Sequence, residues 1–506
     1  MTPGLNDDEA SSLGKLVDHF PEARELGERF VKAGHELYLV GGTVRDALLA
    51  QSALAEGDLS AFTKIDLDFA TSARPEQTEA ILRSWGDAVW LTGAAFGTVS
   101  AKKNDRDVEI TTFRSEVYEP GSRHPEVAYG STIEGDLARR DFTVNAMAVR
   151  VPDFAFVDLF GGIGDLHRRV LRTPVTPEQS FSDDPLRMVR LARFASRLQA
   201  APDDATMAAA TAMAAQLDTI SAERVRDELV KLLTGADPSR GIDLLLDTGL
   251  AQWVIPELGE LAACVDPIHR HKDVYAHTLA VIDNVIALET DGPDPVLRLA
   301  ALMHDIAKPE TRVIHDDGKV TFHHHEMAGM RVTKRRLKAL KFDNNFVTDV
   351  SELVKLHLRF HTYKEGWTDS AVRRYVTDAG PLLDRLNILT RADVTTRNKR
   401  KANAISRRMD ELEERIAVLR EQEELDSMRP AIDGNDIMAH LGLGPGRDVG
   451  EAWKHLLELR LDRGPMEPDE ALAALDQWWA QRQTPAAPAA DEQALAAVEG
   501  SVEASA

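Results

Sequence analysis

The sequence predicts an α+β fold, in which a small mixed α/β head is followed by a longer helical part. Two observations indicate this class. Between residues 37 and 113, short runs with strand-like alternation are interrupted by glycine turns and by helical segments. Later segments, such as residues 299–303 and the charged stretch 393–420, have helical composition. Mixed strands and helices in this order suit a compact catalytic head.

The composition is that of a soluble globular protein, with 43% hydrophobic and 28% charged residues, and 506 residues are enough for several domains. The single cysteine, Cys264, excludes an intramolecular disulfide framework and fits a reducing compartment. Neither a secretory signal nor an apolar run long enough to span a bilayer is found. We therefore expect a cytoplasmic protein that does not bind membranes.

The net charge of −23 opposes nucleic-acid binding on average. Any RNA site must therefore be a local basic surface. Two runs are candidates, 331–338 and 397–401, although a basic run of this kind is more often a solvated helix face.

An apolar run at residues 37–40 leads into Gly41 and Gly42, and then into a helical segment that contains Arg45 and Asp46. Two glycines let the backbone approach a phosphate closely, and a helix N-terminus directs N–H groups at it. A glycine turn of this kind is weak evidence for a phosphate-binding site by itself.

The next run, residues 65–69, alternates apolar and acidic residues as a strand does. Asp66 and Asp68 therefore project from one face, where they repel each other unless a cation lies between them. Such oxygen ligands suit Mg²⁺, which usually also binds substrate phosphates. A lone pair of this kind is more often an exposed edge strand, but after a phosphate-type turn it favours nucleotidyl transfer.

The rest of the head is also expected to consist of short strands, helices and connecting loops. Residues before about 24 are expected to be loose or partly helical, residues 58–63 to be a polar connection, and a capped helix to start near Pro75. Strands are expected at 89–91, 97–101 and 106–113. Glu109, on the last of these, could lie beside the two aspartates as a third carboxylate. Residues 115–130 contain two prolines and two glycines and predict a long loop.

Residues 41–46 together with 66–68 resemble the signature of class II tRNA nucleotidyltransferases, the CCA-adding enzymes, which bacterial poly(A) polymerases share. The resemblance extends from about residue 37 to 482. It implies a nucleotidyltransferase head, an all-helical neck and further helical domains. It also implies binding of CTP, ATP and the 3′ end of tRNA.

Residues 137–148 resemble the second motif of this family. Arg139 and Arg140 can supply positive charge to phosphate, while Asp141 and Asn145 can bind ribose or orient the arginines. A capped helix with a surface arginine pair is the structural alternative.

Residues 182–190 resemble the base-reading motif of the family, and 221–229 its last neck motif. We expect Asp184 and Arg187 to share a helix face, where Asp184 accepts from the exocyclic amine of cytosine or adenine. Without the family, this pair would be an ordinary helix salt bridge. Arg190 is a further nucleotide-binding candidate, and Glu223 and Arg224 are expected to support the nucleotide helix.

A second constellation follows, with the ligand types that a borderline divalent ion takes. Its candidate ligands are His277, His304, Asp305 and Asp393, with His325 and His357 as accessory candidates. The series resembles the HD phosphohydrolase superfamily, and some tRNA nucleotidyltransferases of this class carry an HD domain. A divalent metal, with a transition metal as one candidate, is therefore expected here, and Mg²⁺ is expected at the head.

The expected domains are a head at 24–150, a neck at 151–262, an HD domain at 263–396, a C-terminal helical module at 397–482 and a disordered tail at 483–506. The expected activity is addition of C, C and A to tRNA by two-metal nucleotidyl transfer, with an accessory HD hydrolase site. Three alternatives stay open: a poly(A) polymerase, an enzyme that adds only CC or only A, and an HD phosphohydrolase with a nucleotide-binding head. The sequence leaves the oligomeric state open.

Overall fold

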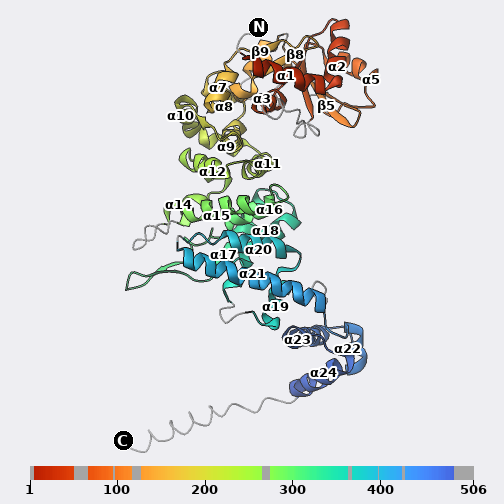
Figure 1. Cartoon of the computed structure of the whole chain (residues 1–506), viewed down its shortest axis with the longest axis vertical. Helices are drawn as coiled ribbons and strands as arrows, with labels where there is room; N and C mark the ends of the chain where they lie inside the picture. Colours follow the sequence, from red (N-terminus) through yellow and green to blue (C-terminus); the bar gives the residue numbers. More distant parts are fainter. Residues whose placement is uncertain are drawn as a thin grey trace, which may run out of the picture. The chain divides into compact units, whose positions relative to one another are not determined.

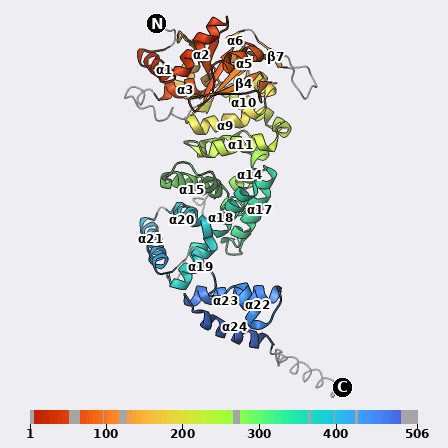
Figure 2. The ribbon, with the colours of Figure 1, turned by 90° about the vertical axis from the view of Figure 1, so that its right-hand side faces the viewer.

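A computed structural model describes residues 5–50, 66–94, 97–116, 127–130, 132–264, 274–362, 367–396, 398–423 and 428–483. The chain forms two compact units, Met1–Val354 and Lys355–Ala506, which are described separately here. The first contains a sheet followed by helices, and the second is helical (Figures 1 and 2). The predicted α+β class is confirmed, whereas the predicted domain boundaries stay predictions.

The centre of the first unit is a seven-stranded sheet with the order β3-β4-β5-β2-β1-β8-β9. The strand bounds are β1 Leu37–Val40, β2 Leu67–Thr71, β3 Ala88–Trp90, β4 Thr98–Lys103, β5 Arg106–Thr112, β8 Met147–Val151 and β9 Phe156–Asp158. Neighbouring strands are antiparallel except β2 and β5, which are parallel. The strands predicted in the head are confirmed with ends shifted by one or two residues.

Alternation along these strands separates a buried face from an open one. On β5, Val108 and Ile110 are fully buried, while Asp107 and Glu109, which alternate with them, are exposed. All four residues of β1 are buried, as expected for a strand inside a sheet. The open face of β2 and β5 is therefore where the acidic side chains gather.

The helices around the sheet are α1 Asp7–His19, α2 Pro21–Lys32, α3 Gly42–Leu49, α5 Pro75–Arg83, α6 Ile133–Ala138 and α7 Gly162–Arg168. The expectation of a loose or partly helical leader before residue 24 is corrected, because α1 and the start of α2 occupy this region. Phe20, between them, is fully buried, so these helices belong to the core. The polar connection expected at 58–63 lies outside the described residues.

The loop predicted at residues 115–130 is partly wrong. Its two ends form an antiparallel pair, β6 Arg114–Glu116 and β7 Val127–Tyr129, in which Ser115 lies opposite Ala128. Residues 117–126 lie outside the described residues. The two strands have no sequence alternation that would identify them.

The remainder of the first unit is helical except for two short strand pairs, β10–β11 and β12–β13. Their bounds are β10 Val170–Leu171, β11 Ala201–Pro202, β12 Arg312–Ile314 and β13 Val320–Phe322. The helices are α8 Pro177–Asp183, α9 Leu186–Leu198, α10 Asp204–Met213, α11 Ala222–Leu233, α12 Pro238–Asp247, α13 Ala251–Val254, α14 Glu257–Ala263, α15 Val274–Leu288, α16 Pro295–Met303, α17 His325–Ala339 and α18 Asn344–Leu356. Helix α9 packs against α11 and α12 (Figure 1).

The second unit contains α19 Asp369–Ala379, α20 Leu383–Ala392, α21 Lys399–Gln422, α22 Gly434–Leu441, α23 Arg447–Arg463 and α24 Pro468–Gln483. Helices α22, α23 and α24 share a core that includes Ile437, Leu456 and Leu475. Nearly all of the tail predicted to be disordered, residues 484–506, lies outside the described residues. Among the described helices, none is both long and apolar enough to cross a membrane.

Candidate active site

A pocket of about 540 Å³ opens where the open face of the sheet meets helix α9. The sheet side contributes Gly41, Asp68 and Glu109, and the helix side contributes arginines. The other lining residues are Val40, Gly42, Arg45, Phe69, Thr111, Arg114, Asp136, Arg139, Arg140, Asp141, Asn145, Asp184, Leu186, Arg187, Arg190, Arg193, Phe194, Arg197 and Arg224. The pocket thus places carboxylates opposite a strongly cationic wall.

The glycine turn lies at the N-terminus of α3, as the sequence predicts. Gly41 has φ +76°, a conformation that L side chains rarely adopt, and it precedes the first residue of α3. A Cβ on Gly41 would lie 3.3 Å from a guanidinium nitrogen of Arg140 and 4.0 Å from a carboxylate oxygen of Asp68. Because Gly41 has no side chain, the guanidinium of Arg140 and the carboxylate of Asp68 can both lie close to its backbone.

The predicted carboxylates lie on neighbouring strands, with Asp68 opposite Glu109 in the parallel pair β2–β5. Asp66 is exposed one residue before β2. Loss of hydration inside the pocket and the negative charge of Glu109 raise the pKa of Asp68 to about 6, with a smaller contribution from Asp66, while Arg140 opposes the shift. Among the described residues, the three do not form a tight ligand group, since groups of three within 4.8 Å occur only elsewhere.

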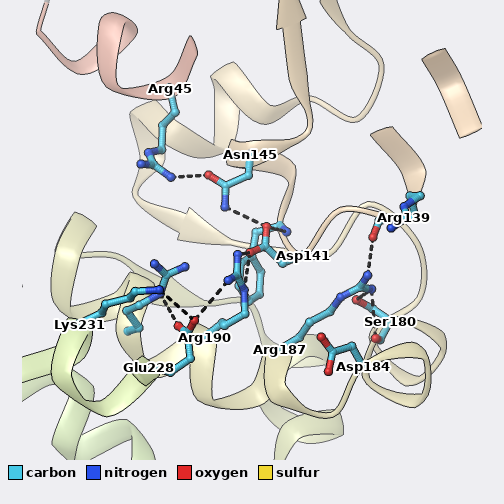
Figure 3. A network of polar contacts seen from close by, with 12 residues as sticks. Arg45, Arg139, Asp141, Asn145, Ser180, Asp184, Arg187, Arg190, Glu228 and Lys231 are labelled. Atoms are coloured by element: carbon cyan, nitrogen blue, oxygen red, sulfur yellow. Dashed lines mark hydrogen bonds and ion pairs between the residues drawn. The ribbon is translucent and has the colours of Figure 1, made fainter. Parts of the chain in front are cut away.

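A buried polar chain connects the glycine helix to α9 (Figure 3). Arg45 donates to Asn145, Asn145 donates to Asp141 at 2.8 Å, and Asp141 accepts from Arg190. Burial by itself raises the pKa of Asp141, but the charge of Arg190 and the hydrogen bonds outweigh it and lower the pKa below its usual value. Asp141 therefore orients Arg190, whereas the sequence analysis considered Arg139 and Arg140 as the arginines that it could orient.

The predicted helix face shared by Asp184 and Arg187 is corrected. Asp184 has extended backbone angles after α8, and α9 begins at Leu186, so the two residues are not on one helix. Pro185 separates them. Both side chains nevertheless line the pocket.

Each of these two side chains is held by a different partner, and Figure 3 shows the contacts of Arg187 with Ser180 and Arg139. Arg187 is buried, and it donates to the hydroxyl of Ser180 at 2.9 Å and to the carbonyl of Arg139. Asp184 accepts from Arg224 at 2.8 Å. The guanidinium and the carboxylate are thus fixed before a ligand arrives.

Sequence reasoning missed two arginines of the cationic wall, Arg193 and Arg197, both on α9. Arg193 pairs with Glu228 at 2.7 Å and lies 4.0 Å above the ring of Phe194. Burial, and then the charge of Arg190, lower the pKa of Arg193 to about 10. Together with Arg187 and Arg190, these residues recur every three or four positions, a helical stripe that could have identified them.

Helix α11 supports this stripe. Glu228 is buried and pairs with Arg190, Arg193 and Lys231, and Arg224 holds Asp184. Glu223 is exposed at the start of the same helix and is not among the residues that line the pocket. The helix therefore positions α9 mainly through Glu228.

A second cluster lies among α15, α16 and α17. Nε2 of His304 lies 3.2 Å from Nε2 of His277, and both approach one oxygen of Asp305, at 3.2 and 3.5 Å. Nε2 of His325 lies 3.2 Å from the other oxygen. Lys308 contacts the carboxylate at 2.5 Å. Three of the predicted ligands, His277, His304 and Asp305, thus converge.

The orientation of these imidazoles suits a metal. Nδ1 of His304 lies 2.8 Å from the carbonyl of Ala301, and Nδ1 of His325 lies 2.7 Å from that of Phe322. A carbonyl can only accept, so Nδ1 carries the proton and Nε2 presents its lone pair to the cluster. Burial alone would raise the pKa of Asp305, but His304 and Lys308 hold it well below its usual value.

His357 and Asp393, the remaining predicted ligands, belong to the second unit. His357 is buried directly after α18, and Asp393 follows α20 and is partly exposed. Their participation in the cluster stays a prediction.

The predicted basic surfaces also stay predictions. On α17, Arg331, Lys334, Arg335 and Lys338 are exposed, whereas Arg336 pairs with Glu257 at 2.9 Å. In the second run, residue 397 lies outside the described residues, and residues 399–401 are exposed at the start of α21.

Three family models match the chain. The Poly A polymerase head domain matches residues 37–172, the probable RNA and SrmB-binding site of polymerase A matches 201–261, and the HD domain matches 274–398.

Two curated relatives are similar over most of the chain. An A-adding tRNA nucleotidyltransferase of Deinococcus radiodurans is 35% identical over 70% of this chain and 82% of its own length. A CCA-adding enzyme of Enterococcus faecalis is 30% identical over 87% of this chain and 91% of its own.

Solved structures with the same fold include the Bacillus stearothermophilus CCA-adding enzyme in complex with CTP. That structure has a TM-score of 0.66 at 24% identity and covers 92% of this chain and 98% of its own. The Thermotoga maritima CCA-adding enzyme complexed with tRNA has a TM-score of 0.56 at 18% identity, over 92% of this chain and 98% of its own. At these identities the likeness is one of fold.

Proposed function

Because the chain belongs to the class II tRNA nucleotidyltransferase family, we propose that it adds C, C and A to the 3′ ends of tRNA from CTP and ATP. The observation that carries this proposal is the pocket itself. Its lining combines Asp68 and Glu109 from the sheet with the arginines of α9, and it includes Asp184 and Arg187. Phosphates, a reacting hydroxyl and a base edge each find matching chemistry there.

The carboxylates fit the Mg²⁺ expected at the head. The raised pKa of Asp68, caused in part by Glu109, indicates negative charge that the protein alone does not compensate. Asp66 and Asp68 would hold the metal, with Glu109 adjacent. Mg²⁺ held there would favour loss of the proton of the attacking hydroxyl to solvent water and would neutralise charge on the triphosphate. In the proposed reaction, the tRNA 3′-oxygen forms a bond to the α-phosphorus of the nucleotide as the bond to pyrophosphate breaks.

The triphosphate is proposed to lie along the arginine wall. Arg190 is held by Asp141 and Glu228, so its fork is oriented toward the pocket at no cost in side-chain freedom during binding. Arg140, beside Gly41, is held by Asp136 at 3.0 Å. Such fixed cations stabilise developing charge better than mobile ones.

Base selection is proposed for Asp184 and Arg187. Asp184 can accept from the exocyclic amine of cytosine or adenine, and Arg187 retains N–H groups beyond those bound to Ser180 and Arg139. Uracil and guanine would present a carbonyl oxygen to Asp184, which would leave two acceptors facing each other.

The experiment that tests the function uses three RNAs: tRNA that ends before CCA, tRNA that ends in CC, and an unrelated RNA. Each is incubated with labelled CTP or ATP, and the products are sized. We expect two C residues and one A on the first tRNA, one A on the second and no addition to the third. Addition of A alone would favour the activity named for the Deinococcus relative, and a long A tail on every RNA would indicate a poly(A) polymerase.

The HD cluster is proposed as a separate metal-dependent phosphohydrolase site. The specific observation is that Nε2 atoms of His277 and His304 face each other at 3.2 Å beside Asp305, an arrangement that a divalent cation would stabilise. The imidazole donors leave a transition metal and Mg²⁺ both open. We also propose that the protein works in the cytoplasm, where its single buried thiol is compatible with reducing conditions.

A further inference from the structure

We propose that Trp90, at the end of the sheet farthest from the glycine turn, stacks on a base near the 3′ end of the RNA acceptor. Trp90 is 44% exposed and is the only tryptophan among the exposed large apolar side chains of the described residues. This inference rests on the proposed function, because it concerns the second substrate of that reaction.

The register of four strands puts Trp90 in line with the candidate catalytic carboxylates. Trp90 on β3 lies opposite Ser100 on β4, Ser100 lies opposite Glu109 on β5, and Glu109 lies opposite Asp68 on β2. Directly opposed residues share a face of the sheet, so these four side chains form one row on the open face. Two of these four strands can be located in the ribbon views, since β5 is labelled in Figure 1 and β4 in Figure 2.

A second hollow follows this row. It has a volume of about 300 Å³, and it is lined by Asp66, Trp90, Ser100, Asp107 and Glu109. Glu109 is the only residue that lines both this hollow and the larger arginine-lined pocket. The two cavities therefore adjoin at Glu109, and a reaction between two substrates needs two such neighbouring sites.

The lining decides which substrate enters which cavity. The larger pocket carries the arginines and suits a triphosphate, whereas the lining of the smaller hollow contains carboxylates, a hydroxyl and an indole but no cation. Carboxylates and Ser100 can hydrogen-bond the hydroxyls of a ribose, and an indole can stack on a base. A nucleoside end of RNA fits this chemistry, and a triphosphate does not.

The distances agree with this assignment. With strands about 4.8 Å apart, Trp90 lies roughly 14 Å from Asp68 and roughly 10 Å from Glu109 along the row. A 3′-hydroxyl at Asp66 and Asp68 thus leaves the base of one of the last nucleotides within reach of Trp90. Stacking accepts every base, which suits an acceptor whose end changes after each addition.

The test uses the full-length enzyme with the changes Trp90→Ala and Trp90→Phe, and Leu91→Ala as a control. Leu91 is 40% exposed beside Trp90 but does not line the hollow. We expect Trp90→Ala to lower kcat/KM for tRNA lacking CCA by about 5- to 100-fold, the loss of one base stack, with KM for CTP unchanged. Trp90→Phe should recover most of the activity, and Leu91→Ala should match the wild type.

A binding measurement separates this inference from the proposed function. Without nucleotide, a tRNA that carries 2-aminopurine as its last base should lose fluorescence on the wild type and on Trp90→Phe, but not on Trp90→Ala. Equal tRNA kinetics and equal quenching in all variants would overturn the inference, as would a Trp90→Ala defect confined to CTP. Quenching that depends on Trp90 without any nucleotide addition would instead overturn the proposed function.

Discussion

The stability of the folded protein is expected to depend on pH through Asp68, because its carboxyl is partly desolvated and lies beside the carboxylate of Glu109. The pKa of about 6 lies above the ordinary value of 3.8, so the folded protein binds this proton more tightly than the unfolded chain does. Without metal, the contribution of Asp68 to stability is therefore largest at low pH and is lost as pH rises through about 6. A bound divalent cation would favour the ionised carboxylate and would therefore remove this loss of stability at higher pH.

We expect Asp68→Asn to abolish nucleotide addition while it raises the metal-free melting temperature relative to the wild type. The difference in melting temperature should be small near pH 4.5 and grow toward pH 7.5, because only the wild type must ionise a partly desolvated carboxyl beside Glu109. Thermal unfolding in EDTA across this range measures it.

Asp105→Asn is the matched control for this prediction, since the Asp105 side chain is 98% exposed. It should show no pH-dependent difference from the wild type. A constant offset between Asp68→Asn and the wild type at all pH values would contradict the assignment of the shift to Asp68.

Asp184 is the residue on which base selection is predicted to depend. We expect Asp184→Ala to slow the use of CTP and ATP and to reduce discrimination against UTP and GTP by roughly 5- to 150-fold, equivalent to about 1–3 kcal/mol. Competition between labelled nucleotides on tRNA lacking CCA measures this ratio. Asp183→Ala, a change at the preceding carboxylate, which does not line the pocket, should keep the preference. Unchanged selectivity of Asp184→Ala would place recognition elsewhere.

At the scale of elements, helix α9 turns one face into a cationic wall, and helix α11 makes this possible. The negative charge of Glu228 compensates the positive charges of Arg190 and Arg193. Without Glu228, these two arginines would repel each other at a place that is partly shielded from solvent. Removal of one partner from a buried charged group is costly because the other charge stays behind.

We therefore expect Glu228→Ala to lower the free energy of unfolding by about 3–5 kcal/mol. On the same helix, Glu223→Ala changes an exposed carboxylate and should stay within about 0.5 kcal/mol of the wild type. Urea denaturation of the three proteins compares them. Equal stability of both variants would show that Glu228 does not support α9.

At the scale of the whole molecule, the two candidate sites use separate residues. The proposed transfer site would use Asp68 and the arginine wall, with Asp66 beside it, while the HD cluster contains His277, His304 and Asp305. A phosphate monoester or 2′,3′-cyclic phosphate at a damaged RNA end blocks the hydroxyl that nucleotide addition needs. A hydrolase on the same chain could remove it, which gives the pairing a chemical rationale.

We expect Asp305→Ala to lose metal-dependent hydrolysis of 2′,3′-cyclic nucleotides or p-nitrophenyl esters while it still adds nucleotides to intact tRNA. Asp68→Asn should do the reverse. Both activities are assayed with Mg²⁺, Mn²⁺, Co²⁺ or Ni²⁺ and after chelation. A wild type without hydrolysis under all conditions would make the HD cluster structural, and loss of nucleotide addition by a folded Asp305→Ala would show that the sites are coupled.

The sequence by itself determined the fold class, five of the seven strands of the head sheet and the family, all of which are confirmed, whereas β8 and β9 were not predicted. These depend on local signals: alternation in strands, glycines at turns and motifs of fixed spacing. It also identified His277, His304 and Asp305 as ligand candidates, and the structure brings them together.

Only the tertiary structure decided which groups pair. Asp184 is held by Arg224 and not by Arg187, Asp141 orients Arg190, and Trp90 joins the row of carboxylates through three strand pairings. The partners in each case are far apart in the chain, by 40 residues for Asp184 and 49 for Asp141. Spacing along a sequence predicts neighbours on one helix or strand, but contacts between elements depend on how the whole core packs.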